Sequence, residues 1–258
     1  MSAIVFYPPM GRGAWPSDGI GGTLNLTGNG PGRYYRAPAT NWATPGSAGA
    51  RAERADGEIP IDAYAVWRAA TAIQVELHER GFTGIAGRAL IPDGIWGPST
   101  EAAVKAFQMR VGLTPDGVFG PASAKALFLP IAARVAEQVD AGHPELATIM
   151  RGTISLESGW DPGAVGRATP QDLGLGQING PAHPKLSTND RLNPKVALPY
   201  IARLIEANLV AFKFNTRDAI AAYNLGQAGA RTWISMGRPQ AYRSARPHEY
   251  IDKILAAG

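Results

Sequence analysis

The sequence predicts a mainly α-helical protein, and three observations carry this prediction. Apolar residues from Ile61 onward recur at the spacing of one helix face, and Gly81 stands where a helix-ending glycine is expected. A turn followed by a helix start occurs twice, at Asp93 and again 23 residues later at Asp116. Further helical segments follow from Pro144 to the end of the chain.

The composition of the 258 residues indicates an ordinary globular protein with one large domain or two smaller ones. The net charge of +4 is a mild basic bias, so we expect no nucleic-acid partner. No stretch approaches 18 apolar residues, so no membrane insertion is expected. The N-terminus lacks a basic region, and its apolar run breaks at Pro8-Pro9, which predicts no signal peptide.

The chain contains no cysteine, which excludes disulfides, a cysteine-ligated metal site and a cysteine nucleophile. The four histidines show no metal-ligand spacing. We therefore expect neither a metal nor a cofactor, and we expect a monomer.

Three regions follow one another along the chain. Residues 1–60 hold 18 glycines and prolines, against 34 in the other 198 residues, and form a loop-rich segment of unknown role. Residues 61–129 are expected to form a small three-helix bundle. Residues 130–258 are expected to form a second domain, beginning with a helix from Pro130 to about Ala141. Without a flexible linker, the two domains should be joined stiffly.

The repeat gives the bundle two similar units. Each has an Asp-Gly turn, an aromatic residue, a Gly-Pro break and a helix start. The motif residues are Asp93, Gly94, Trp96 and Gly97 in the first unit, and Asp116, Gly117, Phe119 and Gly120 in the second. The two aromatics are expected in the core rather than in contact with a ligand.

The second domain is expected to contain several capped helices. Pro144 opens the first, and a glycine-rich stretch follows from Gly163 to Gly180. Asn193 caps a helix to about Phe212, and Thr216 caps the next, to Asn224. Two short helices, near 228–235 and 247–256, finish the chain.

Glu157 is the most informative residue for chemistry. It lies seven residues after Met150 and three after Ile154, so it continues the apolar stripe of its predicted helix. Burial should raise the pKa of this carboxyl group, so that it stays protonated near neutral pH and can donate a proton. The alternative is a buried glutamate paired with Arg151, Arg167 or another cation.

Four segments resemble the lysozyme-like transglycosylase family of the soluble lytic type, over about residues 144–256. They are Glu157-Ser158, Gly174-Leu175-Gly176-Gln177, Ala222-Tyr223-Asn224 and a late helix with Tyr250. The resemblance implies a lysozyme-like α (α+β) catalytic domain with Glu157 as the catalytic acid. Gly176 stands where the family usually has methionine, which should loosen one contact.

The same resemblance implies substrate-binding roles for the other matched residues. Ser158 would help to position the acid or the sugar, Gln177 would hydrogen bond in the groove, and Tyr250 would face the acid. Tyr223 and Asn224 would supply the groove wall and its polar contact. The alternatives are core aromatics for the two tyrosines, a helix end for Asn224, and backbone hydrogen bonds in the turn for Gln177.

Residues 72–128 independently resemble the small helical peptidoglycan-binding domain, through Gln74, the two Asp-Gly turns and Phe107-Gln108. Together the resemblances imply cleavage of the β-1,4 bond between N-acetylmuramic acid and N-acetylglucosamine, with peptidoglycan as the partner. The resemblance also implies that this cleavage needs no second carboxylate. If Asp161 or Asp172 faced Glu157, however, it could activate water, and the enzyme would be a hydrolytic muramidase. Asp161 is expected in a turn and Asp172 in a solvated loop.

The architecture resembles that of phage endolysins, which wait in the host cytoplasm for a holin and then lyse the cell wall. A virion-associated lysin, attached through residues 1–60 to a virion partner, is a second interpretation. A wall-binding protein without catalysis is a third.

Overall fold

The structure, a computed structural model, describes residues 61–139, 143–166 and 171–258, with Asp62 and Ala63 described by their backbone only. It is mainly α-helical, as predicted. The interpretation of residues 1–60 lies outside the described residues. The bounds of the elements are α1 Ile61–Glu79, the 3-10 turn η1 Ile85–Gly87, α2 Pro98–Arg110, α3 Pro121–Val139, α4 Pro144–Ser158, β1 Asp172–Leu173, β2 Ile178–Asn179, α5 Thr188–Arg191, α6 Pro194–Ala211, α7 Thr216–Ser235 and α8 Pro247–Ala257.

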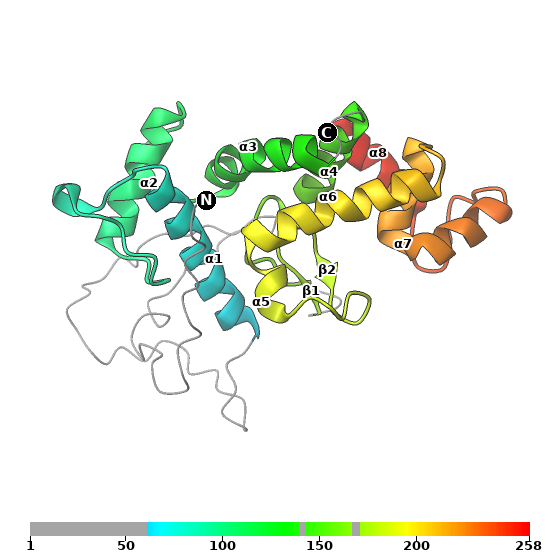
Figure 1. Cartoon of the computed structure of the whole chain (residues 1–258), viewed down its shortest axis with the longest axis horizontal. Coiled ribbons are helices and arrows are strands. Elements are labelled where there is room, and N and C mark those ends of the chain that lie inside the picture. The colour runs from blue at the N-terminus through cyan, green and yellow to red at the C-terminus, as the bar shows by residue number, and fades with distance from the viewer. Residues whose placement is uncertain (1–60, 140–142, 167–170) are drawn as a thin grey trace, which may run out of the picture.

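The predicted bundle is formed by α1, α2 and the first half of α3, with α1 and α2 at one side of the molecule in Figure 1. Aromatic side chains fill its centre. Phe107 meets Phe82 edge to face at a centroid distance of 5.6 Å, and Phe119 meets Trp96 at 6.1 Å. Trp96 and Phe119 are both buried, so the prediction that they belong to the core is confirmed.

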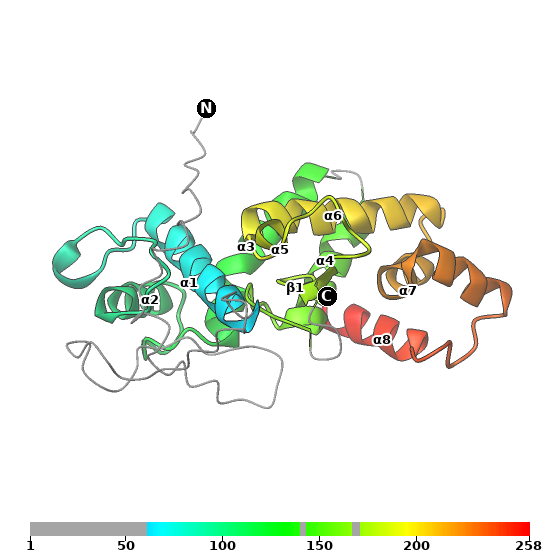
Figure 2. The ribbon, with the colours of Figure 1, turned by 90° about the horizontal axis from the view of Figure 1, so that it is seen from below.

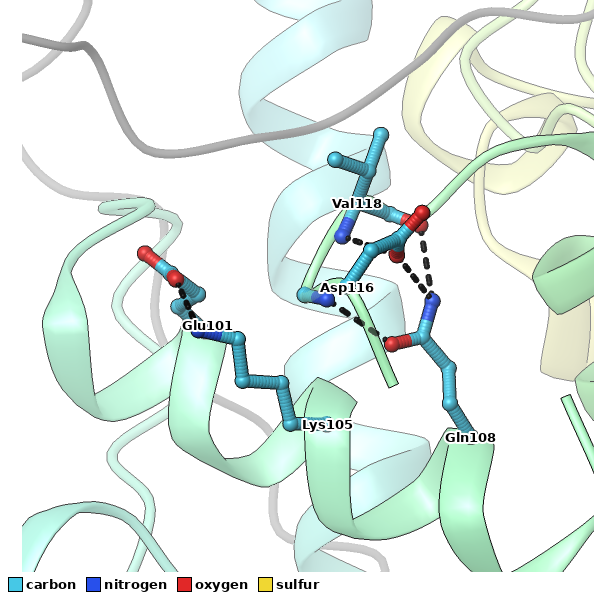
Figure 3. Close-up of polar contacts among 6 residues, drawn as sticks. Glu101, Lys105, Gln108, Asp116 and Val118 are labelled. Atoms are coloured by element: carbon cyan, nitrogen blue, oxygen red, sulfur yellow. Dashed lines mark hydrogen bonds and ion pairs between the residues drawn. The ribbon is translucent and has the colours of Figure 1, made fainter. Parts of the chain in front are cut away.

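A buried glutamine holds each Asp-Gly turn of the repeat. The Gln108 amide nitrogen donates to Asp116 Oδ1 at 2.8 Å and to the Val118 carbonyl at 2.9 Å, while its oxygen accepts from the Gly117 amide at 2.9 Å (Figure 3). The first turn is held in the same way, with Gln74 bound to Asp93, Gly94, Ile95 and Thr100. The glutamines precede their turns by different distances, which is why the repeat alone does not reveal the pairing.

We expect Gln108→Leu to destabilise the protein by about 2–4 kcal/mol, because it leaves buried groups of the second turn without partners. Denaturant unfolding measures the effect. Glu101→Gln is the matched control, since it removes only the partly exposed ion pair with Lys105 drawn in Figure 3. That change should cost less than about 1 kcal/mol. Equal losses for both variants would contradict the role given to Gln108.

The helix start predicted at Pro130 is wrong, because α3 runs without interruption from Pro121 to Val139 with Pro130 inside it. A proline inside a helix costs about 3 kcal/mol, because it removes the hydrogen bond to the carbonyl four residues earlier, here that of Ala126. Arg80 donates to the neighbouring Leu127 carbonyl at 2.7 Å. Packing compensates for the cost, since Phe128 before the proline and Val135 after it belong to one hydrophobic core. The domain boundary predicted between residues 129 and 130 therefore falls within a continuous helix.

The second half of α3 packs on α4 and α6, and α4 packs in turn on α8 (Figures 1 and 2). Helix α6 also packs on α7. Asn215 rather than Thr216 caps α7, with its side chain accepting from the Asp218 amide, and Gly226 breaks the helical geometry within it. A two-stranded antiparallel hairpin lies below α6 in Figure 1 and pairs Asp172 with Asn179. We call residues 171–180 the hairpin.

Candidate active site

Glu157 lies in the last turn of α4, as the periodicity predicts. The buried residues before it on this helix include Leu146, Ile149, Met150 and Ile154. Gly159 then adopts a left-handed conformation with φ of 60° and ends the helix. Glu157 therefore lies on the buried face of α4, at the end of the helix where the chain changes direction.

Burial raises the pKa of the Glu157 carboxyl group, and the nearby charge of Asp172 raises it further. A hydrogen bond from Tyr250 acts in the opposite direction but does not cancel the shift. Among the described residues, no cation forms an ion pair with Glu157. The alternative of a salt bridge to Arg151 is therefore not seen, and Arg167 lies outside the described residues.

Tyr250 reaches Glu157 from α8. Its hydroxyl donates to Glu157 Oε1 at 2.5 Å, a bond between two side chains 93 residues apart. Burial and the neighbouring carboxyl group raise the pKa of Tyr250 well above its usual value, so the phenol keeps its proton and acts as the donor. The predicted approach of Tyr250 to the acid is thus present in the geometry.

Tyr223 approaches the site from α7 and is near enough to Glu157 and Tyr250 to interact electrostatically with both. Its hydroxyl donates to the Gly176 carbonyl at 2.9 Å, and burial and Glu157 raise its pKa well above the usual value. A Cβ atom on Gly176 would lie 2.6 Å from Ile201 Cδ1 and 2.7 Å from the Tyr223 hydroxyl. Gly176 is therefore tightly packed, and its carbonyl group accepts the hydrogen bond from the Tyr223 hydroxyl.

The other three predicted substrate-binding residues, Gln177, Ser158 and Asn224, have three different environments in the structure. The Gln177 amide nitrogen donates to the carbonyls of Ala164 at 3.2 Å and Gly174 at 3.1 Å, so this group is used to shape the turn. Ser158 is buried, with its hydroxyl donating to the Ile154 carbonyl at 3.1 Å. Asn224 is exposed on α7. Contacts with a sugar remain a proposal for all three.

The structure agrees with the prediction for Asp161 but not with the prediction for Asp172. Asp161 is buried in a turn and accepts from the Gly163 amide at 2.8 Å, as expected. The solvated loop predicted for Asp172 is wrong, because this residue is half-buried on β1 and accepts from Asn179 at 2.7 Å. A strand of two residues is too short to produce an alternating pattern, so the sequence gives no signal for it.

Sequence reasoning also missed the arginine that ties the hairpin together. Arg191 Nη1 donates to the Gln171 carbonyl at 2.5 Å and to the Ile178 carbonyl at 3.2 Å, which joins both sides of the hairpin. The side chain is buried, and a Cβ on Gly180 would lie 3.0 Å from it. Its position at the end of α5 carries no motif that could have revealed this role.

A histidine–tyrosine pair was missed as well. His183 Nδ1 and the Tyr200 hydroxyl lie 2.8 Å apart, and Tyr200 is close enough to Tyr223 to raise the pKa of that phenol. Burial lowers the pKa of His183, so the ring favours the neutral form. No spacing in the sequence links these two residues.

Two family models match the chain, one after the other. Residues 69–127 match the peptidoglycan binding domain, and residues 134–244 match the transglycosylase SLT domain. No curated protein and no solved structure matches the chain significantly. The segment that carries Glu157 and Tyr223 lies within the second match, and Tyr250 lies just beyond it.

The fold and the matches define a modular protein with a wall-binding module ahead of a lysozyme-like module. More particularly, the chain carries a peptidoglycan-binding domain followed by a transglycosylase SLT domain. This order supports a peptidoglycan-degrading function of the transglycosylase type. Within residues 61–139, 143–166 and 171–258, every helix is too short or too polar to span a bilayer.

Proposed function

We propose that this chain cleaves the β-1,4 bond between N-acetylmuramic acid and N-acetylglucosamine, with Glu157 as general acid and then as base. The observation that carries the proposal is the shielded carboxyl group of Glu157, whose pKa is raised and which accepts a hydrogen bond from Tyr250. Perturbed carboxyl groups of this kind gather at catalytic sites. The SLT match over the same helix supports the reaction class.

In the proposed reaction, Glu157 gives its proton to the glycosidic oxygen as the bond to the muramic acid carbon breaks. The acetamido group of that sugar stabilises the positive charge. The C6 hydroxyl then closes a 1,6-anhydro ring and returns its proton to the Glu157 carboxylate. Water is not consumed, and the acid is ready for another cycle.

Hydrolysis by a muramidase is the second candidate, and Asp172 is the observation that favours it. This carboxyl group is near enough to Glu157 to raise the pKa of the acid, and a second carboxylate in the site could activate water. Digestion of purified peptidoglycan with mass spectrometry of the products separates the two. We expect anhydro-ended muropeptides from both the unchanged protein and Asp172→Asn. Reducing ends from the unchanged protein, lost in Asp172→Asn, would establish hydrolysis instead.

The pH dependence of kcat/KM tests the role of Glu157, because two substitutions near it should shift the pH profile in opposite directions. A general acid acts in its protonated form, so activity falls as the pH rises through its pKa. Tyr250→Phe removes a bond that favours the carboxylate of Glu157, so the alkaline limb should move to higher pH. Asp172→Asn removes a negative charge, so the limb should move to lower pH. Shifts of the same sign would contradict Glu157 as the acid.

For the biological setting, we propose a phage endolysin that lyses the bacterial wall from within after release by a holin. A virion-associated lysin is the alternative, with residues 1–60 as the attachment segment, and detection of the protein in purified virions would decide for it. A wall-binding protein without catalysis is a third candidate. Zymography on purified peptidoglycan excludes it if a cleared band appears.

A further inference from the structure

A small hydrophobic cluster joins the wall-binding module to the catalytic module, separate from the main core. It consists of buried Ala65 on α1, Leu173 on β1 and Leu192 after α5, with Ile61, Tyr64 and Val165 packed around them. Figures 1 and 2 both show the first turns of α1 beside α5 and the hairpin. Ala65 has no exposed surface, so this end of α1 fits closely against the catalytic module.

This cluster contacts the hairpin on the side away from the candidate site. Neighbouring residues of a strand point to opposite faces, and Leu173 is the neighbour of Asp172. Leu173 therefore packs toward α1, while Asp172 is directed to the side on which it influences Glu157. Leu173 also pairs with Ile178, the residue next to Gln177.

The hairpin and the end of α5, which lie between α1 and the site, are packed so closely that they can hardly move relative to each other. A Cβ on Gly174 would lie 2.1 Å from the Arg191 carbonyl, so the hairpin and the end of α5 touch through their backbones. The Arg191 side chain then binds carbonyls on both sides of the hairpin. A displacement at Leu173 or Leu192 should therefore reach Asp172 rather than be absorbed locally.

We propose that the first turns of α1, through Ala65 and Tyr64, are positioning residues that hold the hairpin at its catalytic distance from Glu157. The inference rests on the proposed function for its effect on catalysis. It gives the wall-binding module a second task, because the module then supports the catalytic geometry as well as binding the polymer. Removal of this support should lower turnover even on substrates that need no wall binding.

Ala65→Asp and Tyr64→Ala in the full-length chain test the proposal. Ala65→Asp places a charge in the cluster, and Tyr64→Ala removes a ring from its edge with less risk to folding. Tyr64→Phe is the matched control, since it keeps the ring and removes only the hydroxyl group, which lies 3.4 Å from Asn189. Lys195→Gln is a second control, because it breaks the exposed ion pair with Glu79. Circular dichroism verifies that each variant is folded.

On a soluble, uncrosslinked muropeptide tetrasaccharide, we expect Ala65→Asp and Tyr64→Ala to lower kcat about 10- to 100-fold. Binding to purified cell-wall sacculi should stay unchanged. Among the residues that the structure describes, three ionisable groups face Glu157, namely Asp172 from β1, Tyr223 from α7 and Tyr250 from α8. Since only Asp172 is carried by the hairpin, the alkaline limb should move to lower pH, as in Asp172→Asn.

Hydrogen exchange at the Gly166 and Gly174 amides provides a readout that does not depend on activity. Both amides are hydrogen bonded where the hairpin meets residues 164–166, and exchange should be faster in Ala65→Asp and Tyr64→Ala than in the controls. Folded variants with unchanged kcat, pH profile and exchange would overturn the inference. If the unchanged protein cleaves nothing, the proposed function fails, and the exchange rates still decide whether α1 holds the hairpin.

Discussion

Glu157→Gln should abolish cleavage of peptidoglycan while leaving wall binding intact. Glutamine has nearly the shape of the protonated acid and can still contact Tyr250, but it has no proton to give to the glycosidic oxygen. General acid catalysis contributes about 10²–10⁴ in rate, and in the proposed reaction the same group also serves as the base, so we expect a loss of at least about 10³-fold. Release of soluble muropeptides from purified sacculi measures the loss.

The matched control for this variant is Glu145→Gln. Glu145 lies in the first turn of the same helix α4, is exposed, and is remote along the helix from the site. The change makes the same carboxyl-to-amide substitution and should leave cleavage unaltered. Sedimentation with sacculi should give equal binding for both variants, because the peptidoglycan-binding domain is untouched. Full activity in Glu157→Gln would overturn the assignment of the acid.

Gly152→Ala should cause a large loss of stability, because α4 and α8 touch through their backbones at Gly152. A Cβ at this position would lie 2.1 Å from the Ile254 carbonyl, which is backbone and cannot rotate away. Alanine favours a helix by about 1 kcal/mol over glycine, whereas overpacking costs about 1–3 kcal/mol or more. We expect a net loss of about 2 kcal/mol in the free energy of unfolding, measured with denaturant.

The same substitution should also lower activity. Glu157 follows Gly152 on α4, and Tyr250 precedes Ile254 on α8, so separating the two helices lengthens the hydrogen bond between the acid and the phenol. A displacement of this kind costs about 10-fold or more in kcat.

Gly229→Ala on α7 is the control for Gly152→Ala. There the added Cβ would meet only side chains, with Leu225 Cβ at 3.2 Å. This variant should be as stable as the unchanged protein. A stable, active Gly152→Ala would mean that α4 and α8 tolerate separation.

Several features of the fold could be predicted from the sequence because they are local. Gly81 and Gly159 end helices in the left-handed conformation, and Asn193 caps α6, as the residue types indicate. The apolar stripe of α4 likewise placed Glu157 at its helix end. Such signals depend on residues within a few positions of one another, so periodicity and capping rules can read them.

Other features depend on packing between distant segments, which no local pattern encodes. The two glutamines that hold the Asp-Gly turns stand at different distances from them, and α3 continues through Pro130 because both of its halves are buried. In the site, Asp172 is turned inward by a hairpin too short to show alternation.

The sequence by itself determined a mainly helical chain with two Asp-Gly units and an acid at a helix end. Only the tertiary structure decided which groups surround that acid, because Tyr250, Tyr223 and Asp172 come from three different elements. It also decided that α1 packs on the hairpin. The physical reason is that the pKa of a carboxyl group depends on its neighbours in space, and those neighbours are fixed by the packing of α4, α7, α8 and the hairpin.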